Sequence, residues 1–299
     1  MNEDDILRHT SRSFYLTIRW LPRAVRSDVA LAYLLARATD TVADTSSAAP
    51  AARLELLQSA RDSRERPEIT GFRPEEWVRH QRDPAEQALL AAWPAWWRRM
   101  HERDDDSRRL LTTVLGHILE GQIFDLERFG PEAPPLAPEE VERYTWLVAG
   151  SVGEFWTDLC AARLRDFATA PVEVMRSRAR RYGQALQLVN ILRDRRMDAA
   201  LGRVYVAPEA VEPWAAKARL WLGEGAAYAA ALRSGRLRYA TVLPALLGWR
   251  TLVCVAEQAE GTLTPAKVPR VEWRRWLRRA LPVWWSPQAV LRLARAASE

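Results

Sequence analysis

Apolar residues recur along most of this chain at the three- and four-residue spacing that one face of an α-helix requires. No stretch alternates apolar and polar residues convincingly enough to indicate a strand. The pattern predicts helices of about 15–25 residues joined by short turns, and therefore an all-α, bundle-like fold. We expect helix breaks at Leu21-Pro22, Ser46 to Pro50, Arg66 to Pro74, Asp83-Pro84, Gly130 to Pro138, and Ala207 to Pro213.

Length and composition suit one large domain. The chain has 299 residues, 48% of them hydrophobic, and no shift in composition separates two halves. We predict a single domain over residues 1–299, with a tryptophan- and arginine-rich C-terminal extension at residues 262–299. That extension either docks on the bundle or rests at a membrane surface. Docking is favoured, because its arginines are not confined to one helix face.

Charge and targeting signals narrow the partners. The net charge is +6, and the basic residues are almost all arginine. A basic protein suits a polyanionic substrate such as a diphosphate. The preference for arginine over lysine is also explained by genomic base composition alone. Nucleic acid is not expected as a partner, because no dense basic run or known binding motif is present. No apolar run reaches about 18 residues, so we expect no transmembrane segment. The acidic start MNEDDILRHT is no signal peptide, and we expect a cytoplasmic protein.

Two aspartate pairs have the same spacing, Asp40 with Asp44 and Asp194 with Asp198. Side chains at i and i+4 of a helix lie about 5–6 Å apart at Cβ. The two carboxylates of each pair therefore repel each other unless a cation lies between them. A solvated helix face is the simpler interpretation of either pair alone. Each pair, however, follows an apolar run, VALAYLLARA or ALQLVNIL, and carboxylates ending a buried helix are costly unless paired or metal-bound. We therefore predict a Mg²⁺ and diphosphate site, with all four aspartates as metal ligands.

Five motifs in order resemble those of the squalene/phytoene synthase family, over roughly residues 8 to 255. They are SRSFYLTIRWLP, LARATDTVADT, GQIFDLERF, YTWLVAGSVGEFW, and ALQLVNILRD followed by GRVY. The resemblance implies an isoprenoid synthase-type helical bundle around a central cavity. It also implies Mg²⁺-dependent ionisation of an allylic isoprenyl diphosphate by a prenyltransferase.

The resemblance also implies roles for particular residues. Tyr144 falls at the position of the family's catalytic tyrosine, together with Asp40, Asp44, Asp194 and Asp198 in the catalytic set. Arginines would clamp phosphate, and aromatic rings would stabilise an allylic cation. The expected substrate-binding residues are Ser11, Arg12, Phe14, Arg37, Gln122, Trp146, Asn190, Arg193, Arg203 and Tyr205. NADPH stays open as a second cofactor, and no glycine-rich dinucleotide motif supports it.

The second aspartate motif departs from the family. Met197 stands where many members have glutamate, and Arg195 and Arg196 occupy the middle of the pair. These changes put full metal loading there in question. Two functions follow. The first is head-to-head coupling of two diphosphates, expected to be farnesyl, to presqualene diphosphate or a squalene-type C30 product. The second is prenyl transfer to an aromatic small-molecule acceptor. A non-catalytic partner subunit is a third, weaker interpretation.

Overall fold

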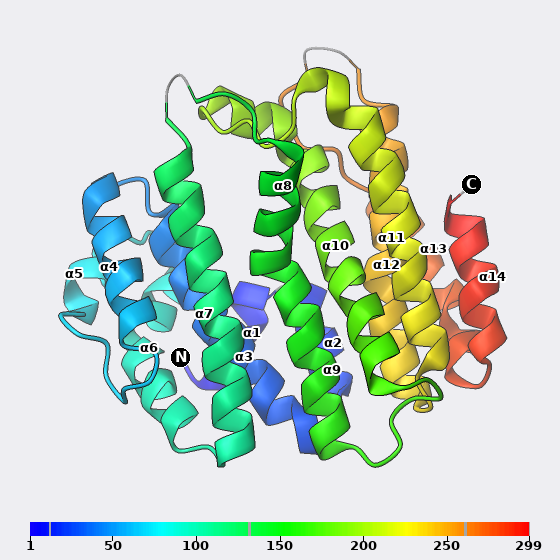
Figure 1. Ribbon diagram of the computed structural model, residues 1–299, viewed down its shortest axis with the longest axis horizontal. Helices are drawn as coiled ribbons and strands as arrows, with labels where there is room; N and C mark the ends of the chain where they lie inside the picture. The colour runs from blue at the N-terminus through cyan, green and yellow to red at the C-terminus, as the bar shows by residue number, and fades with distance from the viewer. Residues whose placement is uncertain (12, 131–132, 260–261, 299) are drawn as a thin grey trace. The chain divides into compact units, whose positions relative to one another are not determined.

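The computed structural model describes residues 1–11, 13–130, 133–259 and 262–298, with only the backbone of residues 13, 14 and 16. These residues form helices and no strand, and an isolated bridge joins Ala168 to Leu232 (Figure 1). The all-α prediction is confirmed. The contacts divide the chain into two compact units, Met1–Arg128 (unit 1) and Phe129–Glu299 (unit 2). The single domain expected over residues 1–299, with its central cavity, stays a prediction.

Unit 1 is built around α3, which packs on α4, α6 and α7. Its core contains Leu31 and Leu34 of α3 and the indoles of Trp93 and Trp97, all with essentially no accessible surface. Prolines occupy the first turns of several helices, where no backbone donor is lost. The helices are α1 (Glu3–Ser11), α2 (Ser13–Trp20), α3 (Arg23–Asp44), α4 (Pro50–Asp62), α5 (Pro74–Val78), α6 (Pro84–His101) and α7 (Asp105–Arg128).

Unit 2 is arranged around α10, which packs on α9, α11 and α12 (Figure 1). Gly183 of α10 meets a π-helical turn, where an added Cβ would lie 2.2 Å from the Ala149 carbonyl oxygen, so only glycine fits. The elements are α8 (Pro138–Thr145), η1 (Trp146–Gly150, the π-helical turn), α9 (Ser151–Arg163), α10 (Val172–Ala200), η2 (Pro208–Ala210), α11 (Val211–Ala231), α12 (Gly235–Ala256), α13 (Arg270–Arg279), η3 (Leu281–Trp284) and α14 (Pro287–Ser298).

Non-helical residues separate the helices at all six predicted breaks, but five of the predicted ranges end on a proline that already belongs to the next helix. The first residues of α4, α5, α6 and α8 are Pro50, Pro74, Pro84 and Pro138. Pro213 lies inside the first turn of α11, which begins at Val211. Proline is tolerated there, because the first backbone N–H groups of a helix have no intrahelical partner. Pro94 and Pro244, in contrast, lie within α6 and α12, which continue past them.

The C-terminal segment packs against α11 and α12 within unit 2. Trp276, Val283 and Val290 are buried in this contact. The guanidinium of Arg238, on α12, is also buried and donates to four backbone carbonyls, those of Leu232, Arg233, Val283 and Trp284, at 2.7–2.9 Å. Because a buried guanidinium is costly without acceptors, this arrangement ties η3 firmly to the start of α12.

Helix α12 alone among the described helices is long and apolar enough to cross a membrane by length and composition. Such a segment was not expected from the sequence, in which no uninterrupted apolar run reaches about 18 residues. Of its most apolar window, 56% is buried inside the protein, and core helices of globular domains pass the same test. The apolar character of α12 is therefore weak evidence for a membrane span.

Candidate functional site

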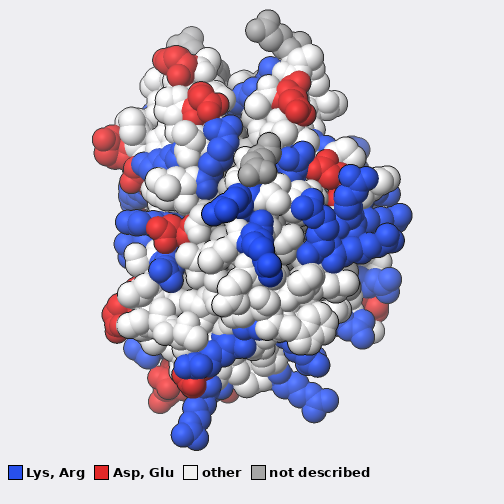
Figure 2. All heavy atoms as spheres, turned by 90° about the vertical axis from the view of Figure 1, so that its right-hand side faces the viewer, with Lys and Arg blue, Asp and Glu red and all other residues white. Residues whose placement is uncertain are grey.

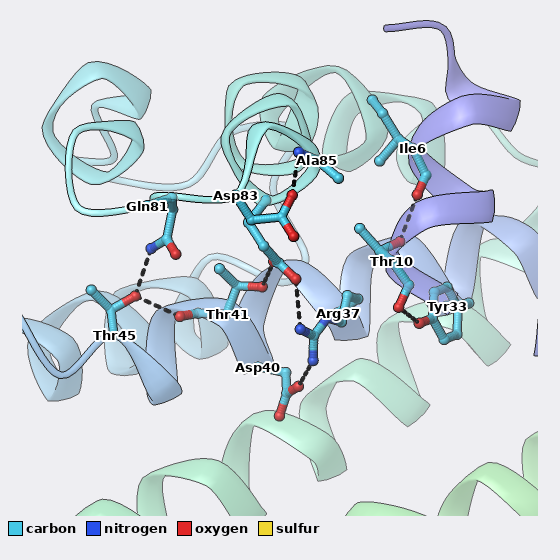
Figure 3. A network of polar contacts seen from close by, with 11 residues as sticks. Ile6, Thr10, Tyr33, Arg37, Asp40, Thr41, Thr45, Gln81, Asp83 and Ala85 are labelled. Carbon is cyan, nitrogen blue, oxygen red and sulfur yellow. Dashed lines mark hydrogen bonds and ion pairs between the residues drawn. The ribbon is translucent and has the colours of Figure 1, made fainter. Parts of the chain in front are cut away.

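The first aspartate pair ends α3 in unit 1, where a polar network surrounds it (Figure 3). The Arg37 guanidinium bridges two carboxylates, with Nη1 2.5 Å from Asp40 Oδ2 and Nη2 2.6 Å from Glu86 Oε1. The Thr41 hydroxyl donates to the other oxygen of Glu86. Glu86, in the first turn of α6, thus fixes the arginine that in turn orients Asp40. Sequence reasoning missed Glu86, because 45 residues or more separate it from its partners.

Electrostatics at this pair favour a cation. Desolvation by the surrounding protein, followed by the charge of Asp44, raises the pKa of Asp40 to about 6, against the lowering effect of Arg37. The Asp40 side chain nevertheless keeps 45% of its surface accessible. The carboxyl is therefore closely surrounded by protein yet within reach of a small ligand. Arg37 is shared with Glu86, so the three carboxylates retain an excess of negative charge.

Neighbouring hydrogen bonds hold the end of α3 in place (Figure 3). Gln81 Nε2 donates to the Thr45 hydroxyl at 2.8 Å, and Thr45 donates to the Thr41 carbonyl at 2.6 Å. The Tyr33 hydroxyl donates to the Thr10 carbonyl at 2.9 Å, and burial raises the pKa of Tyr33 to about 12. These hydrogen bonds from neighbouring segments fix the position of the last turns of α3, and with it the position of Asp40.

Other predicted residues of unit 1 have varied surroundings. The buried Ser11 hydroxyl donates to the Leu7 carbonyl within α1. Gln122 of α7 is 9% exposed, and its Oε1 has no hydrogen-bond partner among the described residues. An unsatisfied buried acceptor costs about 1–3 kcal/mol, so Gln122 is available to a donor on a ligand. Arg12 and the side chain of Phe14 lie outside the described residues.

The second aspartate pair, on α10 in unit 2, is already neutralised by arginines. Arg193 contacts both oxygens of Asp194, at 2.9 and 2.5 Å, and this bond is the main cause of the raised pKa of Arg193. Arg203 Nη2 lies 3.4 Å from Asp198 Oδ1. The two pairs share their spacing but differ in charge balance. Asn190, one turn before Asp194, is half-buried.

Arg195 and Arg196 make their described bonds with backbone carbonyls. Arg195 Nη1 donates to Leu192 at 2.9 Å, and Arg196 Nη1 donates to Ala259 at 2.5 Å and to Thr262 at 3.2 Å. Arg196 therefore links the end of α10 to the chain that follows α12. Among the described residues, neither Arg195 nor Arg196 forms a hydrogen bond or ion pair with Asp194 or Asp198.

Tyr144 and Tyr205, 61 positions apart, come together in unit 2. Their rings stack with centroids 5.2 Å apart and planes inclined by 27°, and both residues are buried. Phe129 adds an edge contact to Tyr205, with centroids 4.7 Å apart. The structure thus places the predicted catalytic tyrosine against a predicted substrate-binding tyrosine, in an aromatic cluster.

Trp146 faces a different partner. Its Nε1 donates to the buried Glu154 at 3.1 Å, and the Arg180 guanidinium lies 6.0 Å from its ring centroid. Arg180 also holds Glu154 through contacts of 2.8 and 2.6 Å. Residues two apart on a helix project roughly 200° from each other, so Trp146 turns away from the side of Tyr144. This cluster braces the π-helical turn that follows α8.

The donor chemistry suits Mg²⁺, although no group of three or more His, Cys, Asp and Glu side chains in the described chain forms a complete site. Mg²⁺ is usually held by one or two carboxylates plus water and substrate phosphate. Asp40 and Asp44 offer such a set, and the pKa of Asp40 is raised by burial and by the neighbouring charge of Asp44, both of which a bound cation would offset. The first pair therefore fits the ion; the second fits only if its arginines release their carboxylates.

The sequence is similar to a known protein family and to named relatives. The sequence profile of the squalene/phytoene synthase family matches residues 7–209. A bifunctional lycopene cyclase/phytoene synthase of Blakeslea trispora is 32% identical over 212 residues, which cover 68% of this chain and 31% of that protein. A presqualene diphosphate synthase of Zymomonas mobilis is 28% identical over 204 residues, 68% of this chain and 58% of that protein. The chain thus spans about a third of the length of the first of these relatives.

Solved structures share the fold. TcSQS in complex with the ligand BPH1237 covers 99% of this chain and 89% of its own, with a TM-score of 0.78 and 20% identity. A dehydrosqualene synthase in complex with a ligand covers 93% of both chains, with a TM-score of 0.62 and 21% identity. The squalene synthase HpnC from Alicyclobacillus acidocaldarius covers 86% of this chain and 94% of its own, with a TM-score of 0.58 and 18% identity.

Proposed function

The chain belongs to the squalene/phytoene synthase family, whose members are prenyltransferases, and we propose that it couples two allylic isoprenyl diphosphates head to head in a Mg²⁺-dependent reaction. We take the substrate to be farnesyl diphosphate and the product to be presqualene diphosphate or a squalene-type C30 compound. The single observation that carries the proposal is the Asp40–Asp44 pair at the end of α3, where burial and then the charge of Asp44 raise the pKa of Asp40 to about 6.

Bound Mg²⁺ would neutralise diphosphate oxygens and make the diphosphate a better leaving group. Asp40 and Asp44 would hold the ion, and the remaining coordination positions would go to water and substrate oxygens. Arg37 would keep Asp40 oriented, since Glu86 anchors its other nitrogen at 2.6 Å. The orientation of the carboxylate oxygens determines where the ion would be held relative to the diphosphate, so residues that fix this orientation contribute to metal binding.

In unit 2 we propose an exchange of partners. Arg193 and Arg203 hold Asp194 and Asp198 in the ligand-free protein. A guanidinium fork also matches the geometry of phosphate oxygens. On substrate binding these arginines would move to phosphate, and the freed aspartates would become available to metal. The arginines thereby prevent self-repulsion of the second pair before substrate arrives.

The Tyr144–Tyr205 cluster would serve the cationic stage of the reaction. A cation over a tyrosine ring is stabilised by about 0.5–2 kcal/mol, with the larger values in dry surroundings. Both rings are buried, so water is largely kept from their faces. The Tyr144 hydroxyl would assist proton movement beside that cation.

Transfer to an aromatic acceptor is not favoured. The relatives described above are named as phytoene and presqualene diphosphate synthases, and none of them for an aromatic acceptor. Trp146, one of the expected substrate-binding residues, donates its indole N–H to Glu154, and this bond gives no support to an aromatic acceptor.

The test is incubation with farnesyl diphosphate and Mg²⁺, with and without NADPH, followed by diphosphate release and mass spectrometry of the products. A C30 product, absent in EDTA and absent with Asp40→Asn, supports the proposal. Geranylgeranyl diphosphate in place of farnesyl diphosphate tests chain length. Diphosphate consumption that needs an added aromatic compound, or no turnover with any allylic diphosphate, would overturn it.

A further inference from the structure

The net charge of the chain resides in its last 38 residues. Residues 262–299 contain eight basic and two acidic residues, a net charge of +6, which equals that of the whole chain. The first 261 residues are consequently neutral overall. Such segregation is not explained by a uniform preference for arginine, and it marks one surface of unit 2 for an anionic partner.

The arginines of this segment are exposed and lack carboxylate partners among the described residues. Figure 2, viewed from the side of α14, shows Lys and Arg atoms gathered over this face with uncharged atoms between them. The one acidic side chain described in the segment, Glu272, accepts from Arg250 at 2.5 Å and so neutralises none of them. The exposed arginines are Arg270, Arg274, Arg275, Arg278, Arg279, Arg292 and Arg295.

Three of the five arginines of α13 and both arginines of α14 lie on one outward face of their helix, closer together than the sequence led us to expect. On α13, Val271, Arg274, Arg275 and Arg278 follow the i, i+3, i+4, i+7 spacing of a single face, and all are exposed. On α14, residues 288, 291, 292 and 295 repeat the same spacing and are exposed too. The opposite faces anchor the helices, through Trp276 on α13 and Val290 on α14. Docking on the bundle and contact with a further partner are therefore compatible.

Large apolar side chains accompany the arginines. Trp285 is 80% exposed, Val271 71%, Leu291 53% and Leu281 47%. An exposed indole with neighbouring aliphatic groups suits the boundary between headgroups and acyl chains. Nucleic acid or an acidic protein would bind the arginines but would leave most of these apolar side chains exposed to water.

A hollow of about 560 Å³ lies beside α13. Its lining residues come from α12, α13, the residue before α13, and α14, and they include Arg250, Glu272, Arg275, Trp276, Arg279 and Ala296. Glu272 is paired with Arg250 at 2.5 Å, and the Arg279 guanidinium stacks 4.3 Å from the Trp276 ring centroid. Arg275 and Arg279, which have no carboxylate partner among the described residues, therefore add unpaired positive charge to this hollow, and a guanidinium fork matches the oxygens of a phosphate headgroup.

We propose that the face formed by α13, η3 and α14 docks the protein on an anionic lipid bilayer, with the arginines at the headgroups and Trp285 and its apolar neighbours at the interface. The inference rests on this surface and not on the proposed reaction. It does not require α12 to cross the membrane.

The test is co-sedimentation of the full chain with vesicles of phosphatidylcholine, with and without phosphatidylglycerol. The protein should sediment only with the anionic vesicles, and less as salt is raised. Replacing Arg274, Arg275 and Arg278 together by glutamine should weaken binding about 100-fold, since each arginine near such a surface contributes about fivefold. Trp285→Ala should weaken binding while leaving the salt dependence intact.

A matched control replaces three exposed arginines of unit 1, Arg66, Arg79 and Arg82, by glutamine. It removes the same charge and should bind as the parent does. Circular dichroism confirms that each variant is folded. Equal binding to neutral vesicles, equal loss in the unit 1 control, or full binding by the α13 variant would overturn the proposal. So would binding to duplex DNA or polyglutamate with an affinity that matches the anionic vesicles.

Discussion

Asp40→Asn should stabilise the metal-free protein at neutral pH, although it removes an ion-pair partner of Arg37. Burial and Asp44 raise the pKa of Asp40 from 3.8 to about 6. A carboxyl whose pKa rises on folding contributes stability that is fully present below about pH 4 and is lost as pH rises through about 6. Asparagine cannot ionise, and its carbonyl still accepts from Arg37. The variant should therefore avoid the loss.

The magnitude follows from the shift and its screening. About two pKa units correspond to about 3 kcal/mol for a fully shielded group. Because 45% of the Asp40 side chain is accessible, solvent screening reduces this to about 1 kcal/mol. For a protein of this size, about 1 kcal/mol raises Tm by about 2–4 °C.

The assay is thermal unfolding of both proteins in EDTA, at pH 8 and at pH 4. The Tm of the variant should be higher than that of the parent protein at pH 8, and the two Tm values should be equal at pH 4. With Mg²⁺ and inorganic diphosphate the order should reverse, because ligands that bind only the folded parent stabilise it, by about 2.7 kcal/mol at a hundred times Kd. Asp62→Asn, at an aspartate that is 68% exposed, is the control and should show neither effect. A variant that melts lower in EDTA at pH 8, or a difference independent of pH, would refute the reasoning.

Three further substitutions test the site. Glu86→Gln should raise the Mg²⁺ concentration for half-maximal activity by about 10- to 100-fold without loss of helicity, because it releases the support of Arg37; unchanged Mg²⁺ dependence would remove Glu86 from the site. Tyr144→Phe should lower turnover more than about tenfold with little change in KM, as loss of a proton-transfer group does, whereas unchanged turnover would leave Tyr144 a packing residue. Replacing Arg195 and Arg196 together by glutamine should lower Tm by a few degrees at most, through lost charge-assisted bonds to carbonyls worth about 1–3 kcal/mol, and leave Mg²⁺ dependence unaltered; a large change in metal affinity would show that these arginines act on the aspartates.

The sequence by itself determined the helices and the two aspartate pairs. Helical periodicity and proline positions are local properties, and non-helical residues separate the helices at all six predicted breaks. The proline that ends each of the last five predicted ranges belongs to the following helix and was wrongly predicted in the break, because a proline before a helix and one in its first turn look alike in sequence. The i,i+4 spacing alone puts both members of each aspartate pair on one helix face.

Only the tertiary structure decided how those residues are used. Glu86 meets Arg37 across 49 positions, Tyr205 stacks on Tyr144 across 61, and Arg238 gathers carbonyls from segments up to 46 positions away. The two aspartate pairs have the same spacing in sequence, yet Asp40 of the first is held by an arginine shared with Glu86, and the second pair is held by Arg193 and Arg203. The physical reason is that charge balance and burial depend on what packs against a helix face, and that contact is set by the fold of each unit.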